Sequence, residues 1–160
     1  MRQLIALEQV ATTGSGQTTP AHITLAHLRT LRAKVASPAH ANAGYYLHRS
    51  MEAMLCGFNT TGNTNYVVSG SLDGEPRLDG YPVRFVEALP HYSVATAPSQ
   101  GQVVFGDLRY HWLGCCGDIR IDLSTQAGFT TDEILVRALE RFTTGLMADN
   151  ALAVLQLAAQ

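Results

Sequence analysis

The residues best suited to metal or redox chemistry are two adjacent cysteines in the second half of the chain. Cys115 and Cys116 lie close to Trp112, and His111 lies four positions before Cys115. Zinc sites usually take paired ligands at spacings such as Cys-x2-Cys, together with a second pair. Adjacent cysteines cannot both reach one tetrahedral ion comfortably. The sequence therefore predicts reduced thiols that are buried or line a turn, and no metal site.

Other polar residues also fail to form a catalytic pattern. His22 and His27 are five positions apart, which misses the i, i+4 spacing of two ligands on one helix face. Residues 14–16, Gly-Ser-Gly, do not follow a strand, and no lysine follows where a phosphate loop needs one. Asp107 either presents a carboxylate or caps a turn through its own backbone, and we favour the cap. We therefore expect no catalytic residue, no cofactor and no enzyme activity.

Composition narrows the class of protein further. Of 160 residues, 46% are hydrophobic and 15% are charged, which is typical of a folded domain or a compact pair of lobes. The net charge is −2, Lys34 is the only lysine, and acids are interleaved with scattered arginines, so no basic patch for nucleic acid is expected. The sequence contains no run of 18 apolar residues, so no membrane helix is expected. Three cysteines and a start unlike a signal peptide favour reduced thiols in a cytoplasmic setting.

Apolar spacing predicts the elements that would position these residues. Residues 2–11 have leucines at helical spacing and predict the end of a helix. An amphipathic helix is expected to begin at Pro20, with Thr19 as its cap, and its apolar stripe runs over 25–35. A strand is expected over 44–48, followed by a short helix over 51–56 capped by Ser50. Further strands are predicted at these ranges: 66–68, 82–86, 103–105 and 108–113.

The region after residue 117 contains a clear alternation and two ambiguous stretches. Residues 118–123 alternate apolar and charged side chains, which predicts a half-buried strand. Residues 130–142 fit either a helix with a capping box at Thr130 and Glu133, or a long strand. Residues 150–158 carry the same ambiguity.

Several short sequence motifs follow one another in a fixed order in the second part of the chain. They are Asn-Tyr-Val-Val at 65–68, Arg-Leu-Asp-Gly-Tyr-Pro-Val at 77–83, Leu-Pro at 89–90, Val-Val-Phe-Gly-Asp-Leu-Arg-Tyr at 103–110, Asp-Ile-Arg-Ile-Asp-Leu at 118–123 and Arg-Ala-Leu-Glu-Arg-Phe at 137–142. Their order and spacing resemble the C-terminal part of a tailed-phage major capsid protein of the Hong Kong 97 type. The resemblance favours the strand over 134–142.

The resemblance implies an α+β fold made of an axial lobe and part of a peripheral lobe. Residues 1–20 would be the end of a spine helix and a turn, and 21–112 the axial lobe. Residues 113–145 would be antiparallel strands of the peripheral lobe, and 146–160 would return to the axial lobe. The N-terminal arm, the extended loop and most of the spine helix of such proteins have no counterpart in the sequence.

The resemblance also implies a structural role through self-association, into a shell or as the remnant of one. Partners would be other copies or a full-length capsid protein, with no direct grip on nucleic acid and no membrane. The location would be a virion capsid, or the host cytoplasm for a prophage remnant. Crosslinking is not supported, because Asp132 stands where the acceptor asparagine would be and Leu139 where the catalytic glutamate would be.

Six residues are candidates for contacts between subunits: Arg77, Tyr81, Asp132, Arg137, Glu140 and Arg141. Tyrosine is enriched at interfaces, and charged pairs would set the register of a contact more than its strength. Two alternatives remain, a nanocompartment shell protein of the same fold and a small stand-alone binding module or enzyme. Open apolar edges would favour a shell subunit, and covered edges would favour a monomer.

Overall fold

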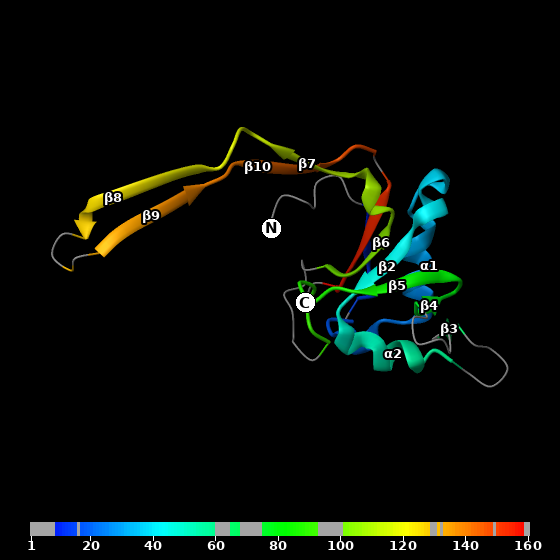
Figure 1. Cartoon of the computed structure of the whole chain (residues 1–160). Coiled ribbons are helices and arrows are strands. Elements are labelled where there is room, and N and C mark those ends of the chain that lie inside the picture. Colours follow the sequence, from blue (N-terminus) through cyan, green and yellow to red (C-terminus); the bar gives the residue numbers. More distant parts are fainter. Residues whose placement is uncertain are drawn as a thin grey trace.

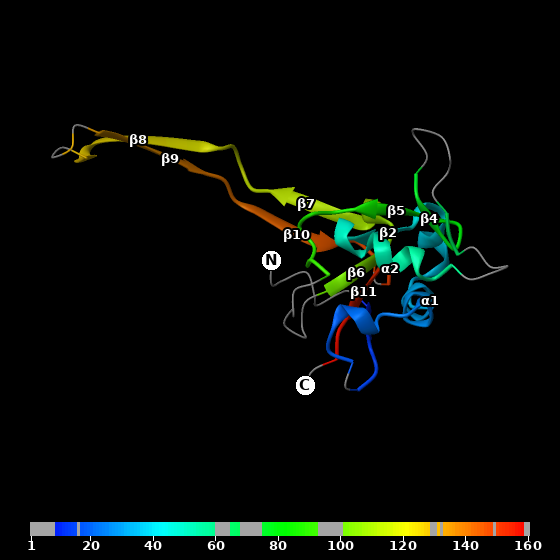
Figure 2. The ribbon, with the colours of Figure 1, turned by 90° about the horizontal axis from the view of Figure 1, so that it is seen from below.

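The computed structural model describes residues 9–15, 17–59, 65–67, 75–92, 101–128, 131, 133–148 and 150–158. These residues form a rounded body built on one mixed sheet and a long arm of paired strands that projects from it (Figures 1 and 2). Helices and antiparallel strands make this an α+β fold, as predicted. Within the described ranges, no helix has the length and apolar character needed to cross a membrane.

The body sheet has seven strands in the order β1-β11-β6-β2-β5-β4-β3. Their bounds are β1 Gln9–Thr12, β2 Gly44–Leu47, β3 Tyr66–Val67, β4 Arg77–Leu78, β5 Tyr81–Phe85, β6 Gly101–Gly106 and β11 Leu152–Gln156. Strand β11 lies between β1, its parallel neighbour, and β6, its antiparallel neighbour. Four of its five residues are buried, which means that both faces of the strand are covered. Apolar residues are therefore needed on both faces, and the strand shows no alternation of apolar and polar residues. This burial explains why residues 150–158 were ambiguous from sequence.

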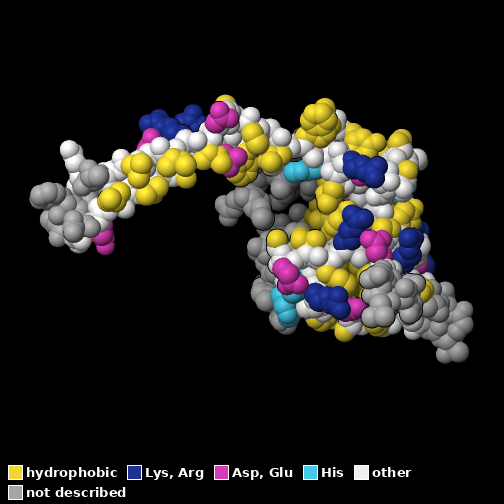
Figure 3. Space-filling model, in the orientation of Figure 1, with side chains coloured by type: hydrophobic (Ala, Val, Ile, Leu, Met, Phe, Trp, Pro, Cys, Tyr) yellow, Lys and Arg dark blue, Asp and Glu magenta, His cyan; other side chains and the backbone are white. Residues whose placement is uncertain are grey.

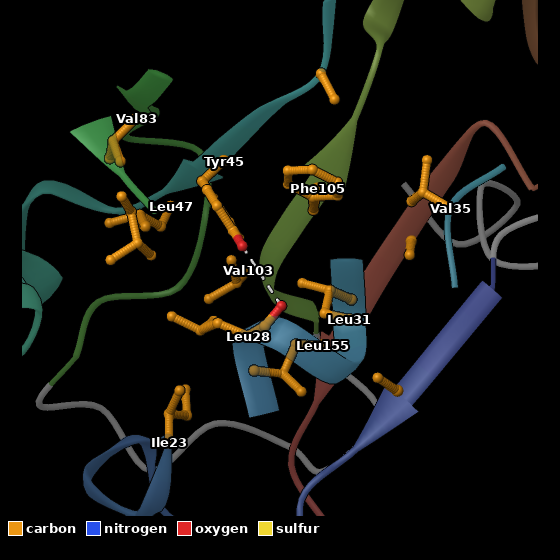
Figure 4. Packing of buried hydrophobic residues seen from close by; sticks show 14 of the residues in the cluster. Ile23, Leu28, Leu31, Val35, Tyr45, Leu47, Val83, Val103, Phe105 and Leu155 are labelled. Atoms are coloured by element: carbon orange, nitrogen blue, oxygen red, sulfur yellow. Dashed lines mark hydrogen bonds between the residues drawn. The ribbon is translucent and has the colours of Figure 1, made fainter. Parts of the chain in front are cut away.

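Helix α1 (Leu25–Ala33) covers one face of the sheet across β1, β11 and β6. Leu28 and Leu31 point from the helix towards Phe105 and Leu155, and all four side chains are fully buried (Figure 4). The Tyr45 hydroxyl donates to the Leu28 carbonyl oxygen at 3.5 Å, which ties β2 to the helix. The apolar stripe of the sequence is therefore the face of the helix that meets the core.

Both predicted helix caps are wrong. The Thr24 hydroxyl oxygen, not Thr19, accepts from the backbone N–H of His27 and caps α1. Pro20 instead begins a separate 3-10 turn, η2 (Pro20–His22), and another, η3 (Ser37–Asn42), follows α1. A further turn, η4 (Arg49–Met51), precedes α2 (Glu52–Cys56), so Ser50 lies inside it. There the His48 ring accepts from the Ser50 N–H.

Two other local predictions need correction. The helix expected over 2–11 is wrong at residues 9–11, which lie in strand β1, because pairing with β11 decides their conformation. Residues 1–8 lie outside the described ranges. The strand expected over 108–113 begins as a 3-10 turn, η5 (Leu108–Tyr110), and becomes β7 (His111–Cys115). Asp107 causes this start, because its buried carboxylate accepts from the Arg109 N–H at 2.9 Å. The predicted turn-capping role of Asp107 is confirmed.

The arm consists of two ribbons of two strands each, in series. Strand β7 pairs with β10 (Phe142–Leu146) near the body, and β8 (Arg120–Gly128) pairs with β9 (Glu133–Leu139) further out. The side-by-side placement of 118–123 and 134–142, and the strand prediction for 134–139, are therefore confirmed. The half-buried prediction is wrong, because Ile121 and Leu123 are exposed on the arm.

Candidate self-association surface

Cross-strand register separates the outer ribbon into two different faces. Leu123 lies opposite Val136, and Ile121 lies opposite Ala138, so these residues share a face. Alternation along β9 adds Ile134 to the same face. We call Ile121, Leu123, Ile134, Val136 and Ala138 the apolar arm face. Its four large side chains are 64%, 70%, 67% and 63% exposed, respectively.

The opposite face of the outer ribbon carries a charged cluster. Asp122 lies directly opposite Arg137, and its two carboxylate oxygens accept from Arg137 Nη2 and Arg120 Nε, each at 2.8 Å. The hydrogen bond from Arg137, and then that from Arg120, holds the pKa of Asp122 below its ordinary value. Leu135 and Leu139 flank this cluster. The two faces of one ribbon therefore differ sharply in polarity.

The space-filling view shows this separation directly. Yellow apolar side chains line the lower edge of the arm, and its dark-blue cationic groups lie along the upper edge (Figure 3). An isolated two-stranded ribbon is at best marginally stable in water, and it usually needs a packed face. Large exposed apolar patches typically mark interaction sites. The arm thus has the physical character of a surface that another polypeptide covers.

The two ribbons meet at a short irregular joint. Residues 116–119 face Glu140 and Arg141 there, and the Cys116 N–H donates to the Arg141 carbonyl oxygen at 2.9 Å. Gly117 has a φ of 80°, a left-handed conformation that glycine adopts without strain. Asp118 and Glu140 are exposed, and neither makes an ion pair or hydrogen bond with another described residue. We call residues 116–119, 140 and 141 the arm joint.

The cysteines do not form a metal site with their neighbours. All three thiols in the chain are free and exposed. Burial, one of the two alternatives expected for Cys115 and Cys116, is therefore wrong, and Cys116 lies in the irregular segment after β7. Within the described residues, no three of His, Cys, Asp and Glu gather closely enough to hold a metal ion.

The body has its own hollow, a pocket of about 430 Å³ beside β4, β5 and η5. Arg77 and Tyr81 line it together with Arg109, so the sequence motifs at 77–83 and 103–110 lie close together in space. The His40 ring lies at the same pocket. Its Nε2–H donates to the Val35 carbonyl oxygen at 3.1 Å, so in the neutral ring Nδ1 accepts from the Tyr81 hydroxyl at 3.0 Å.

The six predicted contact residues therefore fall into two groups. Arg77 and Tyr81 line the body pocket, whereas Arg137, Glu140 and Arg141 lie on the arm. Asp132 lies outside the described residues. Sequence reasoning missed Asp122 as the partner of Arg137, and it missed Arg84, Arg109 and His40 at the pocket. The register of the two predicted strands was the only signal that could have paired Asp122 with Arg137.

Comparison with known proteins agrees with this geometry. The model of the phage capsid family matches residues 4–157. The chain belongs to the phage capsid family. The capsid of the empty GTA particle computed with C5 symmetry is similar to it, with a TM-score of 0.64 and 21% identity over 95% of this chain and 50% of that chain. The capsid of the native GTA particle gives 0.63 and 20% over the same shares.

A protein of Gordonia phage Cozz is also similar in structure. Its TM-score is 0.55 at 16% identity, over 98% of this chain and 51% of that chain. No curated protein matches the chain. The capsid-family chain thus spans about half the length of these solved structures and shares their fold. The predicted membership of a phage capsid family is confirmed, and both the family and the fold are those of a structural protein.

Proposed function

We propose that this capsid-family chain works by contact with other copies of itself or with a longer capsid protein, and that it catalyses no reaction. The observation that carries the proposal is the uncovered apolar arm face. In a monomer whose core is complete, exposing Ile121, Leu123 and Val136 to water brings no stabilisation. A shell subunit needs such a surface, because each copy must be held by its neighbours.

The finer assignment follows the Hong Kong 97 type. Residues 21–112 and 146–160 would form the axial lobe, which corresponds to most of the body. Residues 113–145 would form the peripheral strands, which correspond to the arm. Residues 9–12 belong with the body sheet rather than with a spine helix, because β1 pairs with β11. The assembled location would be a phage particle, with the host cytoplasm as the place of an unassembled remnant.

The energy available from the arm indicates how such a contact would work. Burying one Val, Leu or Ile side chain completely stabilises by about 1.5–3 kcal/mol, so covering four that are about two-thirds exposed contributes about 4–8 kcal/mol. Association costs about 4–15 kcal/mol in lost freedom before any contact is counted. A single arm contact is therefore weak, and a stable assembly would use several contacts on each copy.

Sedimentation velocity and electron microscopy of the purified chain, alone and mixed with a full-length relative, test the proposal. The wild-type chain should associate as its concentration rises. The double variant Leu123→Thr, Val136→Thr keeps residues suited to a strand but removes apolar area, so its apparent association constant should fall at least tenfold.

The matched control carries the same kind of change on the charged face, Leu135→Thr with Leu139→Thr. It should associate more strongly than the apolar-face variant. A wild-type chain that stays monomeric at all concentrations and does not join the longer protein would contradict the proposed function and leave the fold and family intact.

A further inference from the structure

The body pocket gathers three guanidinium groups from three elements. Arg77 is on β4, Arg84 on β5 and Arg109 on η5. Arg77 Nη1 donates to the Gly80 carbonyl oxygen at 2.9 Å, and Arg84 Nη2 lies 3.9 Å from Glu75 Oε1, with both side chains more than half exposed. The Arg109 side chain makes no hydrogen bond or ion pair with another described residue. Much of the positive charge at this pocket is therefore unpaired.

The walls of this pocket are fixed by packing. Tyr81 is held by His40 through its hydroxyl and meets the buried Phe105 ring edge-on, with ring centroids 5.2 Å apart. The Arg32 guanidinium lies 5.5 Å from the centre of the Tyr81 ring. The carboxylate of Asp107 is turned to the backbone of Arg109 and is buried, so it caps η5. A ligand would meet a preformed site and would spend little free energy on ordering it.

Guanidinium groups in an open polar hollow suit a carboxylate, which they bind by paired hydrogen bonds. Among the described residues, two exposed carboxylates have no described partner, Asp118 and Glu140, and both lie at the arm joint. The joint lies beyond the inner ribbon, and the arm projects clear of the body (Figures 1 and 2). The joint also carries Arg141, so its two carboxylates leave it one negative charge in excess, opposite in sign to the arginines of the pocket. The two surfaces belong to separate regions of one molecule.

We infer that the pocket of one copy receives the arm joint of a second copy, with Glu140 or Asp118 placed against Arg109 and Arg77. This inference rests on the proposed self-association and names the surfaces that make it. Such a contact joins two different surfaces, so it is head-to-tail. Repeated contacts of this kind close into a ring when the rotation allows it.

Nucleic-acid phosphate is the competing occupant of an arginine-lined site. The rest of the charge distribution disfavours it. Lys34, the only lysine, donates to the Val10 carbonyl oxygen at 2.8 Å, and the net charge is −2.

A charge swap between two variants tests the inference. Arg109→Glu alters only the pocket, and Glu140→Arg alters only the joint. Each variant alone should lower the apparent association constant at least tenfold, because each leaves like charges in contact. An equimolar mixture of the two should recover association to within a few-fold of wild type, because each pocket then finds a joint of opposite charge. Raising the salt should weaken the wild-type contact.

Matched measurements separate the outcomes. Glu133→Arg makes the same change at the far end of β9 and should leave association near wild type; circular dichroism checks folding of every variant. Wild-type association that survives Arg109→Glu but not the apolar-face variant would overturn this inference and leave the proposed function standing. No wild-type association would overturn both. Failure of the mixture to recover would also overturn it. Binding of duplex DNA that Arg109→Glu abolishes would then assign the pocket to phosphate.

Discussion

The body and the arm both consist of paired strands, but they differ in what covers their faces. Leu155 on β11 is fully buried beneath α1, whereas Leu123 on β8 is largely exposed to solvent. Both strands carry apolar residues suited to a core. The difference teaches that the body completes its own hydrophobic core within one chain. The apolar face of the arm can be buried only by contact with another polypeptide. Substitutions at equivalent residue types in the two regions can test this contrast.

The largest effect is expected from the aromatic core of the body. Phe105 is fully buried and packs against Tyr45, with ring centroids 4.6 Å apart. Phe105→Ala should lower the free energy of unfolding by about 3–5 kcal/mol, because it removes apolar area and leaves a cavity. The matched change on the arm, Phe142→Ala, removes a ring that is 64% exposed and should cost under about 1 kcal/mol in the unassociated chain. Urea denaturation measures both, and equal losses would contradict the contrast.

A second comparison uses two glycines with positive φ. Gly106 in the body has a φ of 144°, and an added Cβ there would overlap the Ala151 carbonyl oxygen and Leu152. Gly106→Ala should therefore cost about 2–4 kcal/mol through strain and overpacking. At the arm joint, nothing lies within 4 Å of a Cβ added to Gly117. Gly117→Ala should cost only about 1–2 kcal/mol, from its left-handed backbone alone. Thermal unfolding measures the loss of stability in both variants. Equal losses would show that the joint is packed as tightly as the body.

The smallest effect is expected from the exposed charged cluster on the arm. The pKa of Asp122 is lowered in the folded chain, chiefly by Arg137. The unfolded chain therefore binds a proton at higher pH than the folded chain does, and the stabilisation is present above the ordinary pKa of about 4 and lost as pH falls below it. Amide hydrogen exchange along β8 and β9 should accelerate as the pH falls through that window, after correction for the intrinsic rate.

Asp122→Asn should remove this pH dependence and change little else. Hydrogen exchange in the body strands provides the internal reference, because Asp122 has no contact with them. A body that loses protection in parallel with the arm would show that the two regions unfold together rather than separately.

Local patterns predicted much of the fold because their cause lies in neighbouring residues. The alternation over 118–123 and the apolar stripe of α1 each reflect a fixed backbone period, and both elements are present. Other elements could not be predicted in this way. Apolar residues over 2–11 recur at helical spacing, but residues 9–12 form β1, because they pair with the edge of β11. The pocket was equally hidden, since Arg77, Arg84 and Arg109 come from separate parts of the chain.

The sequence by itself determined the family, the α+β class and the segments that pair in the arm. It also determined that one side of the 118–123 strand is apolar. Only the tertiary structure decided whether that side is covered, because alternation reports that two faces differ and says nothing of what lies against them. Burial depends on contacts between distant segments, and within the described residues none of these segments packs on the apolar arm face.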